Sequence, residues 1–379
     1  MTPPMGCVRG DPIVRLSLKP FWRRDAMAEG GAEADAEAQP AQALVPYESA
    51  LQALAAQPGD SLALSVRLPF CAAHCLFCNR QIHAAQPLDV IDRYVQALSD
   101  EAAMVAQRVG RDRDVLQLHL GGGSANDLTE VQLLRVVDAL HAAWRLPSDA
   151  ELSVECDPRR VSRQHLDLLR GLGFRHVSFG VADLDATVQR AIGRRNSDRL
   201  IEDVCAAARC AGIERVQLEL LIGLPHQSLQ SWQCTLGRVI EMAPDRVVLA
   251  RYQHGPDRTA GQRAIDSDVL PDAALCGALQ ALSIEVLHAA GYAAISSGHF
   301  VLDDDELALA HAEGRLRLNL IGCTATPAVP VIGLGAGAIG QIDDALYLNH
   351  VGLPDWHAAL AARRLPVAHV RHVQAQGLD

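Results

Sequence analysis

Short apolar or alternating runs repeat along the chain from Leu62 onward, and each is followed by a longer amphipathic segment. The short runs are rich in Val, Ile and Leu, which is typical of strands. They predict six strands, at Leu62–Leu68, Val115–Leu120, Glu151–Cys156, His176–Val181, Arg215–Ile222 and Arg246–Tyr252.

The longer segments place apolar residues at three- and four-residue steps and so predict helices. The clearest helix begins at about Asp89, where Ile91, Tyr94, Val95 and Leu98 share a face. Further helices are predicted at about 130–144, 163–172, 186–192, 198–211, 229–241 and 272–289. Strands that alternate with helices form parallel sheets. The predicted fold class is therefore α/β, a partial (β/α)6 barrel of the TIM type with a short additional C-terminal α/β segment.

Three regions follow from this pattern. Residues 1–58 are predicted to form a flexible N-terminal tail and a short helix, because the stretch from about Met27 to Gln42 is rich in Ala, Glu and Gly and has almost no large apolar side chains. Residues 59–300 form the barrel, and residues 301–379 form a C-terminal extension that covers the barrel mouth.

Composition and charge narrow the function. The formal net charge of −11 disfavours a nucleic-acid partner. There is no apolar run long enough to span a membrane and no secretory signal, so we expect a cytoplasmic protein. The single lysine, Lys19, lies outside the strand-helix region, which removes Schiff-base and P-loop chemistry. In that compartment the 10 cysteines should be reduced, and most are expected to be small buried hydrophobes.

Three cysteines differ from the rest because they lie within eight residues, in Cys71-Ala-Ala-His-Cys75-Leu-Phe-Cys78, directly after the first predicted strand. Three thiolates can bind three irons of a 4Fe-4S cube and leave the fourth iron open for a small chelating ligand. The alternative is a zinc site completed by His74 or His83. The spacing favours the cluster, since the paired CxxC of a zinc ribbon is absent.

Other unusual residues also follow strand ends, where chemistry collects in parallel α/β folds. Gly121, Gly122, Gly123 and Ser124 come after the second predicted strand, and Glu155 ends the third. Glycines allow backbone N–H groups to approach a ligand, although a tight strand-to-helix turn would also explain them.

These motifs resemble the radical S-adenosylmethionine enzymes and, among them, the oxygen-independent coproporphyrinogen III oxidases. The resemblance runs from about Leu62 to about Asn349 and rests on the cysteine motif with five further segments: Leu68-Pro-Phe-Cys71, Gly121–Ser124, Glu155-Cys-Asp-Pro158, Gly223-Leu-Pro225 and Gly298-His-Phe300. It implies a 4Fe-4S cluster on Cys71, Cys75 and Cys78 and an S-adenosylmethionine molecule contacted by Phe77, Gly122, Glu155 and Ile339.

The resemblance also implies a second S-adenosylmethionine site, at Gly123, Ser124, Arg194, Glu219 and Gln253. The match there is mixed, because Gln253 stands where the family has Ala, Ala182 where it has Gln, and Glu219 where it has Asp. Whether the second site is intact is left open.

Several departures concern substrate handling rather than the cluster. Ser65 and Arg67 stand in place of Tyr and His, and Asn79-Arg80 replaces a Gly-Cys pair. Gly298 stands where the family has Asp, and Ile321 and Cys323 replace Gln and Tyr. The chain also ends before the helical C-terminal domain of full-length oxidases.

The resemblance implies oxidative decarboxylation of porphyrinogen propionates to vinyl groups in heme biosynthesis. No catalytic side chain is needed beyond the cofactors, and the expected partners are a porphyrinogen and an electron-donor protein, with the chain itself a monomer. Two alternatives stay open: a related radical enzyme that transfers methyl groups or forms rings on another substrate, and a heme-trafficking protein of the same subfamily.

Overall fold

A single twelve-stranded sheet forms the centre of the computed structural model, which describes residues 40–57 and 59–372. Six parallel strands lie in its middle in the order β1-β4-β5-β6-β7-β8. Their bounds are Leu62–Arg67 (β1), Val115–Gly121 (β4), Glu151–Cys156 (β5), His176–Ala182 (β6), Arg215–Ile222 (β7) and Arg246–Arg251 (β8). Each predicted strand is confirmed to within one residue at either end.

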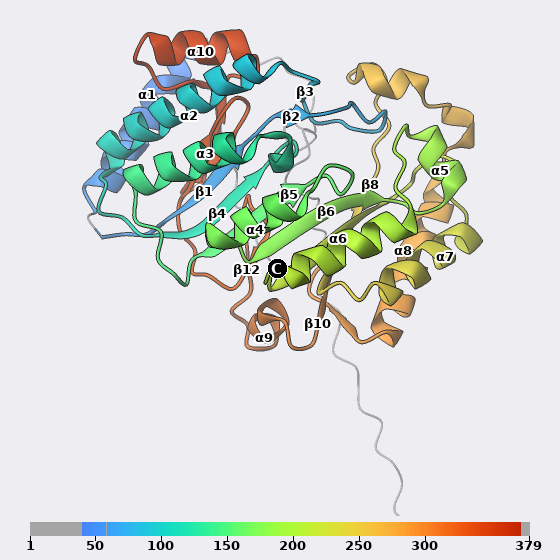
Figure 1. The fold of residues 1–379 in the computed structure, drawn as a ribbon. Helices are drawn as coiled ribbons and strands as arrows, with labels where there is room; N and C mark the ends of the chain where they lie inside the picture. The colour runs from blue at the N-terminus through green and yellow to red at the C-terminus, as the bar shows by residue number, and fades with distance from the viewer. Residues whose placement is uncertain (1–39, 58, 373–379) are drawn as a thin grey trace, which may run out of the picture.

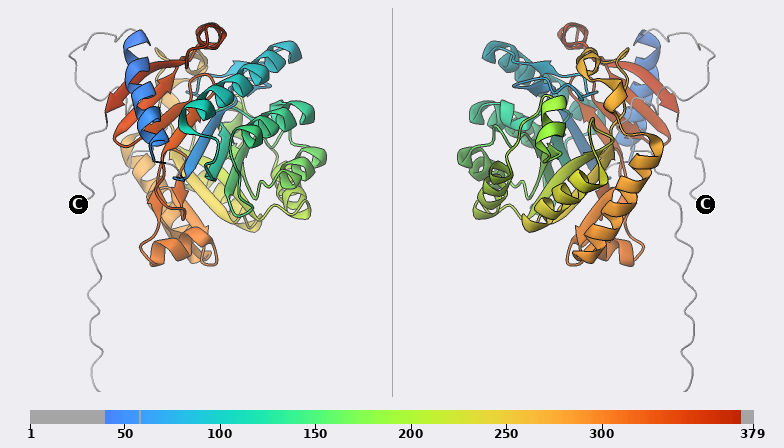
Figure 2. Two further views of the ribbon diagram at one scale, coloured as in Figure 1. Left: turned by 90° about the vertical axis from the view of Figure 1, so that its left-hand side faces the viewer. Right: turned by 90° about the vertical axis from the view of Figure 1, so that its right-hand side faces the viewer.

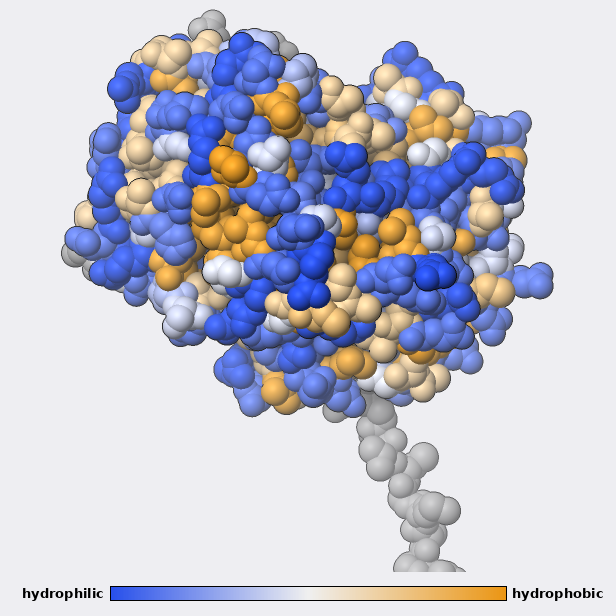
Figure 3. Space-filling model, in the orientation of Figure 1, coloured by the Kyte–Doolittle hydropathy of each residue, from blue (hydrophilic) through white to orange (hydrophobic). Residues whose placement is uncertain are grey.

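Helices cross over between these strands and cover their outer face. They are α2 (Leu88–Val109), α3 (Glu130–Ala143), α4 (Arg163–Gly171), α5 (Ala186–Ala191), α6 (Asp198–Cys210), α7 (Leu229–Glu241) and α8 (Ala273–Ala289). Figure 1 shows α3, α4 and α6 side by side along the strands. On this side of the molecule, patches of hydrophobic residues at the surface are separated by hydrophilic ones (Figure 3). The predicted (β/α)6 arrangement is confirmed. Among the described residues the sheet stays open, with β16 and β9 at its two edges.

The C-terminal part of the chain continues the same sheet beyond β1. Its strands are β13 (Val331–Leu334), which is parallel to β1, and the antiparallel β14 (Ile339–Ile342), β15 (Ala345–Asn349) and β16 (Val367–His372). Helix α10 (Leu353–Ala361) returns over α2, where Trp356 stacks on Tyr94. The buried Glu101 of α2 accepts hydrogen bonds from the Gly335 N–H, Asn349 and Trp356, which joins this part to the core.

The N-terminal residues of the described chain form α1 (Pro40–Ala55), which packs against β16. Tyr47 of α1 lies 4.8 Å from Tyr347 between ring centroids, and Figure 2 shows α1 beside the last strands. The helix begins at Pro40, inside the stretch predicted to be tail; residues 1–39 lie outside the described residues.

The remaining elements lie around the two ends of the strands. At the carboxyl end, β2 (Phe70–Cys71) pairs with β3 (His83–Ala84). At the other edge, β9 (Tyr292–Ala294) and β10 (His299–Leu302) extend the sheet beyond β8, and β10 spans the predicted boundary at residue 300. Next come α9 (Glu306–Ala312), β11 (Arg317–Leu318) and β12 (Cys323–Thr324), with α9 at the end of the barrel opposite β2 (Figure 1). In the described ranges, no helix is long and apolar enough to span a membrane.

Side chains alternate between two environments along the inner strands. On β5, Leu152 and Val154 are buried in the core beneath the helices, whereas Glu151, Ser153 and Glu155 line a cavity inside the barrel. The neighbouring strands repeat this pattern with Gln117 and His119 on β4, His176 and Ser178 on β6, and Gln217 and Glu219 on β7. Barrels of this kind are usually filled by apolar side chains. A polar interior therefore marks a functional cavity.

Candidate active site

The cavity inside the barrel measures about 330 Å3 and reaches the three cysteines at the carboxyl ends of the strands. Cys71 ends β2, and Cys75 and Cys78 lie on the loop that follows it. All three thiols line the cavity. We call residues 71–78 the cysteine loop.

Short contacts hold this loop in place. The Ala72 N–H donates to the Asp127 carboxylate at 2.9 Å, and the Leu76 N–H donates to the Ile192 carbonyl at 3.1 Å. Gly123 lies directly beneath, where a Cβ would come within 2.5 Å of the Phe70 carbonyl oxygen. The glycine turn after β4 thus has a packing role, because only glycine lets it approach the start of the loop this closely.

The donor set fits an iron–sulfur cluster. Burial raises the pKa of the Cys71 thiol to about 12 and also raises that of Cys78, so metal coordination there must displace protons. Within the described residues, no three Cys, His, Asp or Glu side chains surround one metal-ion position. In a 4Fe-4S cube each thiolate binds a different iron, which makes the three thiolates neighbours without a common centre.

Two arginines lie behind Cys75. The Arg194 guanidinium is 3.3 Å from its Sγ and also bonds to the Gly180 carbonyl, while Arg159 is 3.7 Å from the same sulfur and pairs with Asp157. The Nε of Arg194 is buried without a hydrogen-bond partner. Two guanidinium groups thus contact the sulfur of Cys75.

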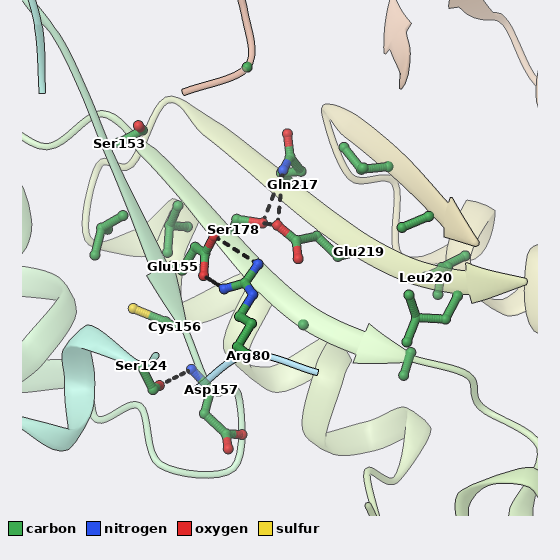
Figure 4. Close-up of a pocket in the computed structure, with 18 of the residues that line it drawn as sticks. Arg80, Ser124, Ser153, Glu155, Cys156, Asp157, Ser178, Gln217, Glu219 and Leu220 are labelled. Carbon is green, nitrogen blue, oxygen red and sulfur yellow. Dashed lines mark hydrogen bonds and ion pairs between the residues drawn. The ribbon is translucent and has the colours of Figure 1, made fainter. Parts of the chain in front are cut away.

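Glu155 lies at the centre of the polar interior, as Figure 4 shows. Arg80 donates to both of its oxygens, with 3.2 Å between Nη2 and Oε1, and His119 Nε2 is 3.5 Å from Oε1. Burial by itself would raise the pKa of Glu155, but Arg80 and His119 outweigh it and hold that pKa below its usual range. Glu155 is therefore an ionised carboxylate that already binds the Arg80 guanidinium.

Glu219 lies two strands further along, on β7. It accepts hydrogen bonds from the Ser178 hydroxyl at 2.6 Å and from Gln217 at 3.4 Å (Figure 4). Burial and the negative charge of Glu155 both raise its pKa. The cavity thus holds two carboxylates, one with a lowered and one with a raised pKa, on strands separated by β6.

Most of the sequence-predicted site residues meet in this cavity. Phe77, Gly123, Ser124, Glu155, Arg194, Glu219 and Gln253 line it together with the three cysteines. Gly122 and Ile339 do not. Gly122 has a φ of +86° and packs under Arg67, and Ile339 begins β14, two strands away from β1.

Some of the predicted site residues also stabilise the fold through hydrogen bonds or packing. The Ser124 hydroxyl is buried, accepts the Asp157 N–H at 2.8 Å and donates to Asn126. Phe77 packs against the apolar cluster of Ala182, Val188, Ile192 and Leu224.

Arg80, His119, Ser178 and Gln217 were not predicted as site residues, although Arg80 had been noted as a departure from the resembling family. The strand sequences do carry a signal for the other three. Parallel strands covered on both faces are usually apolar throughout, whereas β4 to β7 have a polar residue at every second position.

The sequence of the chain is similar to those of known proteins, and this similarity shows its family. Residues 65–236 match the family model of the radical SAM superfamily. The chain is 36% identical over 313 residues to the oxygen-independent coproporphyrinogen III oxidase of Salmonella typhimurium, covering 83% of this chain and 68% of that protein. It is 33% identical over 306 residues to the Synechocystis enzyme of the same name, covering 81% and 66%. The chain belongs to the family of oxygen-independent coproporphyrinogen III oxidases.

A solved structure of this family supports the assignment. Coproporphyrinogen III oxidase from Escherichia coli, described as a radical SAM enzyme, superposes with a TM-score of 0.82 at 33% identity, over 86% of this chain and 74% of that one. Family membership decides the question left by the cysteine spacing, because the superfamily uses a 4Fe-4S cluster and S-adenosylmethionine rather than zinc. The second S-adenosylmethionine molecule stays a prediction.

Proposed function

We propose that the chain is a radical S-adenosylmethionine oxidoreductase that decarboxylates two propionates of coproporphyrinogen III to vinyl groups without oxygen, in heme biosynthesis. One observation carries this proposal: the cavity joins three cysteine thiols to a carboxylate at the carboxyl ends of the strands, in a chain 36% identical to an enzyme of that name.

In this proposal Cys71, Cys75 and Cys78 hold the cluster and leave one iron open. Phe77, Gly122, Glu155 and Ile339 contact the first S-adenosylmethionine. Arg194, Glu219, Gln253, Gly123 and Ser124 would serve a second molecule. The support is that ten of these twelve residues line one cavity.

When bound, the cluster and S-adenosylmethionine would supply the one-electron chemistry: hydrogen abstraction from the propionate β-carbon, followed by loss of CO2 and of one electron to an acceptor, which leaves the vinyl group. The protein has to orient the reactants and exclude water. Glu155 is a carboxylate suited to the ligand's ammonium or hydroxyl groups, and the apolar cluster around Leu224 shields the side near Phe77. No acid–base pair is required for this chemistry.

We further infer that the protein works as a cytoplasmic monomer and takes its electron from a separate donor protein. The cofactors need one electron from outside for each cleavage, and the net charge of −11 disfavours nucleic acid as a partner. Size-exclusion chromatography with light scattering tests the monomer.

The function is tested by anaerobic reconstitution with iron and sulfide, followed by assays for 5′-deoxyadenosine and for vinyl porphyrins, with and without coproporphyrinogen III. We expect both products only when the porphyrinogen is present. Release of 5′-deoxyadenosine that ignores the porphyrinogen would point to another substrate. Equimolar heme binding without cleavage would point to heme trafficking.

A further inference from the structure

Arg80 pairs with Glu155, the carboxylate that is proposed to bind S-adenosylmethionine. It follows the cysteine loop by two residues and turns into the cavity, where Nη1 and Nη2 bond to the two oxygens of Glu155 (Figure 4). In the described part of the chain, Glu155 is the one acidic side chain to which Arg80 is hydrogen-bonded. The pair joins two segments that lie 75 residues apart.

A second arginine, Arg67, interacts electrostatically with Arg80. Burial lowers the pKa of Arg67, and the positive charge of Arg80 lowers it further, whereas Glu155 raises the pKa of Arg80. Arg67 Nη2 donates to the Gln81 carbonyl, and its Nε is buried without a hydrogen-bond partner. Arg67 and Arg80 are thus two interacting cations with few carboxylates to pair with. An additional anion in the cavity would be attracted to them.

Glu155 has little room to bind a second cation beside Arg80. Arg80 takes Oε2, and Arg80 and His119 crowd Oε1. S-adenosylmethionine carries a sulfonium and an ammonium group, so its approach to Glu155 would bring positive charge next to the Arg80 guanidinium. Because like charges repel strongly where water is excluded, the cofactor and Arg80 should compete for this carboxylate.

We propose that Arg80 is a substrate-recognition residue, which pairs with Glu155 until the cofactor binds. S-adenosylmethionine then displaces Arg80 from Glu155, and the freed guanidinium binds a carboxylate of the substrate. The inference rests on the proposed function for the identity of that carboxylate, a porphyrinogen propionate. A guanidinium released inside the cavity must find another anion, since an unpaired buried charge is costly. Its planar fork matches a carboxylate with two parallel hydrogen bonds.

This arrangement makes cofactor and substrate binding cooperative. S-adenosylmethionine breaks the Arg80–Glu155 pair, so the substrate meets a guanidinium that is already free. Couplings of this kind typically change affinity by about 5- to 150-fold, and the effect is equal in both directions.

The test measures binding to the anaerobically reconstituted full chain with the cluster kept oxidised, so that S-adenosylmethionine binds without being cleaved. Its Kd is obtained by equilibrium dialysis. The Kd of coproporphyrin III, the aromatic form with the same propionates, is obtained from fluorescence with and without saturating S-adenosylmethionine. The variants are Arg80→Gln, Arg80→Lys and, as a matched control, Arg251→Gln, which removes an exposed arginine that lines the same cavity.

In the unmodified protein, S-adenosylmethionine should tighten coproporphyrin binding by about fivefold or more. Arg80→Gln should abolish this coupling and leave S-adenosylmethionine binding as tight as before or tighter. Arg80→Lys should restore part of the coupling, and Arg251→Gln should keep the full coupling.

Three results would overturn the proposal: full coupling in Arg80→Gln, no coupling restored in Arg80→Lys, or weaker S-adenosylmethionine binding in Arg80→Gln, which would mean that Arg80 only supports the loop. If coproporphyrin III does not bind the unmodified protein at all, the proposed substrate is wrong. The effect of Arg80→Gln on S-adenosylmethionine binding then still decides whether Arg80 and the cofactor compete.

Discussion

The two ends of the barrel cavity are both rich in charge but differ in how that charge is used. At the opposite end from the cysteines, Arg246 donates to both oxygens of Asp305 at 2.8 and 3.0 Å and to Glu306 at 3.0 Å, and the Thr324 hydroxyl donates to Glu151. These bonds join α9 and β12 to the strands. At the cysteine end, the three thiols and the Arg80–Glu155 pair line the cavity, and the buried Arg194 Nε has no hydrogen-bond partner.

This contrast shows that polar groups inside a barrel can have two roles: they can stabilise the fold or bind ligands. An end whose arginine and carboxylates are bonded to one another contributes to folding, whereas an end with thiols and a displaceable ion pair is suited to ligands. The following substitutions separate the two roles.

The largest effect is expected at the cysteine end. Cys75→Ser should reduce iron content and 5′-deoxyadenosine formation to the level of a protein-free control, because the cofactor supplies the chemistry. Iron analysis and product assays measure it. Cys234→Ser, at an exposed cysteine of α7, should leave both unchanged. Equal losses in the two variants would contradict a specific cluster site.

At the opposite end, Asp305→Asn should lower the free energy of unfolding by about 3–5 kcal/mol, because it leaves the buried Arg246 without its bidentate partner. Urea denaturation measures this loss. The exposed Asp303→Asn change should stay within about 0.5 kcal/mol. If Asp305→Asn instead left stability intact and abolished S-adenosylmethionine binding, the division between the two ends would be wrong.

One strand carries a carboxylate at each end, which allows a matched comparison. Glu155→Gln should weaken S-adenosylmethionine binding by about 10- to 100-fold, since a hydrogen bond to a charged group contributes about 1.5–3 kcal/mol. Glu151→Gln, at the start of the same strand, should change the Kd by less than about twofold. Equilibrium dialysis distinguishes them, and similar weakening in both would contradict the comparison.

The smallest effect concerns pH and His299, which lines the cavity near Arg246. Burial, together with Arg246, lowers the pKa of His299 to about 4. The folded state therefore binds its proton less readily than the unfolded state, so stability is lost as the pH falls from about 6.5 towards 4, by at most about 1.4 kcal/mol per unit. Denaturation midpoints between pH 7 and 4.5 should decline less steeply in His299→Gln. An unchanged slope would rule out this contribution.

The hydrophobic pattern of the sequence was sufficient to predict the barrel, because its buried strands and amphipathic helices alternate regularly along the chain. All six inner strands and the helices between them were predicted, and the cysteine spacing predicts the cluster loop. The strands β13 to β16 were not, since runs as short as Val331–Leu334 fit a strand, a loop or a buried turn equally well.

The site was predicted less completely for a different reason. Arg80 and Glu155 lie on separate elements, and their pairing depends on how the loop turns into the barrel, which no local pattern encodes. The polar residues at alternate strand positions were visible, but their common orientation into one cavity follows only from the curvature of the sheet.

The central claim is that three thiolates at the carboxyl ends of the strands hold a 4Fe-4S cluster with one iron open to S-adenosylmethionine. Electron paramagnetic resonance of the anaerobically reconstituted and reduced protein tests it most directly. The account predicts about four irons per chain and a cluster signal whose g values shift when S-adenosylmethionine is added. Bound zinc in place of iron, or a cluster signal unaffected by S-adenosylmethionine, would contradict it.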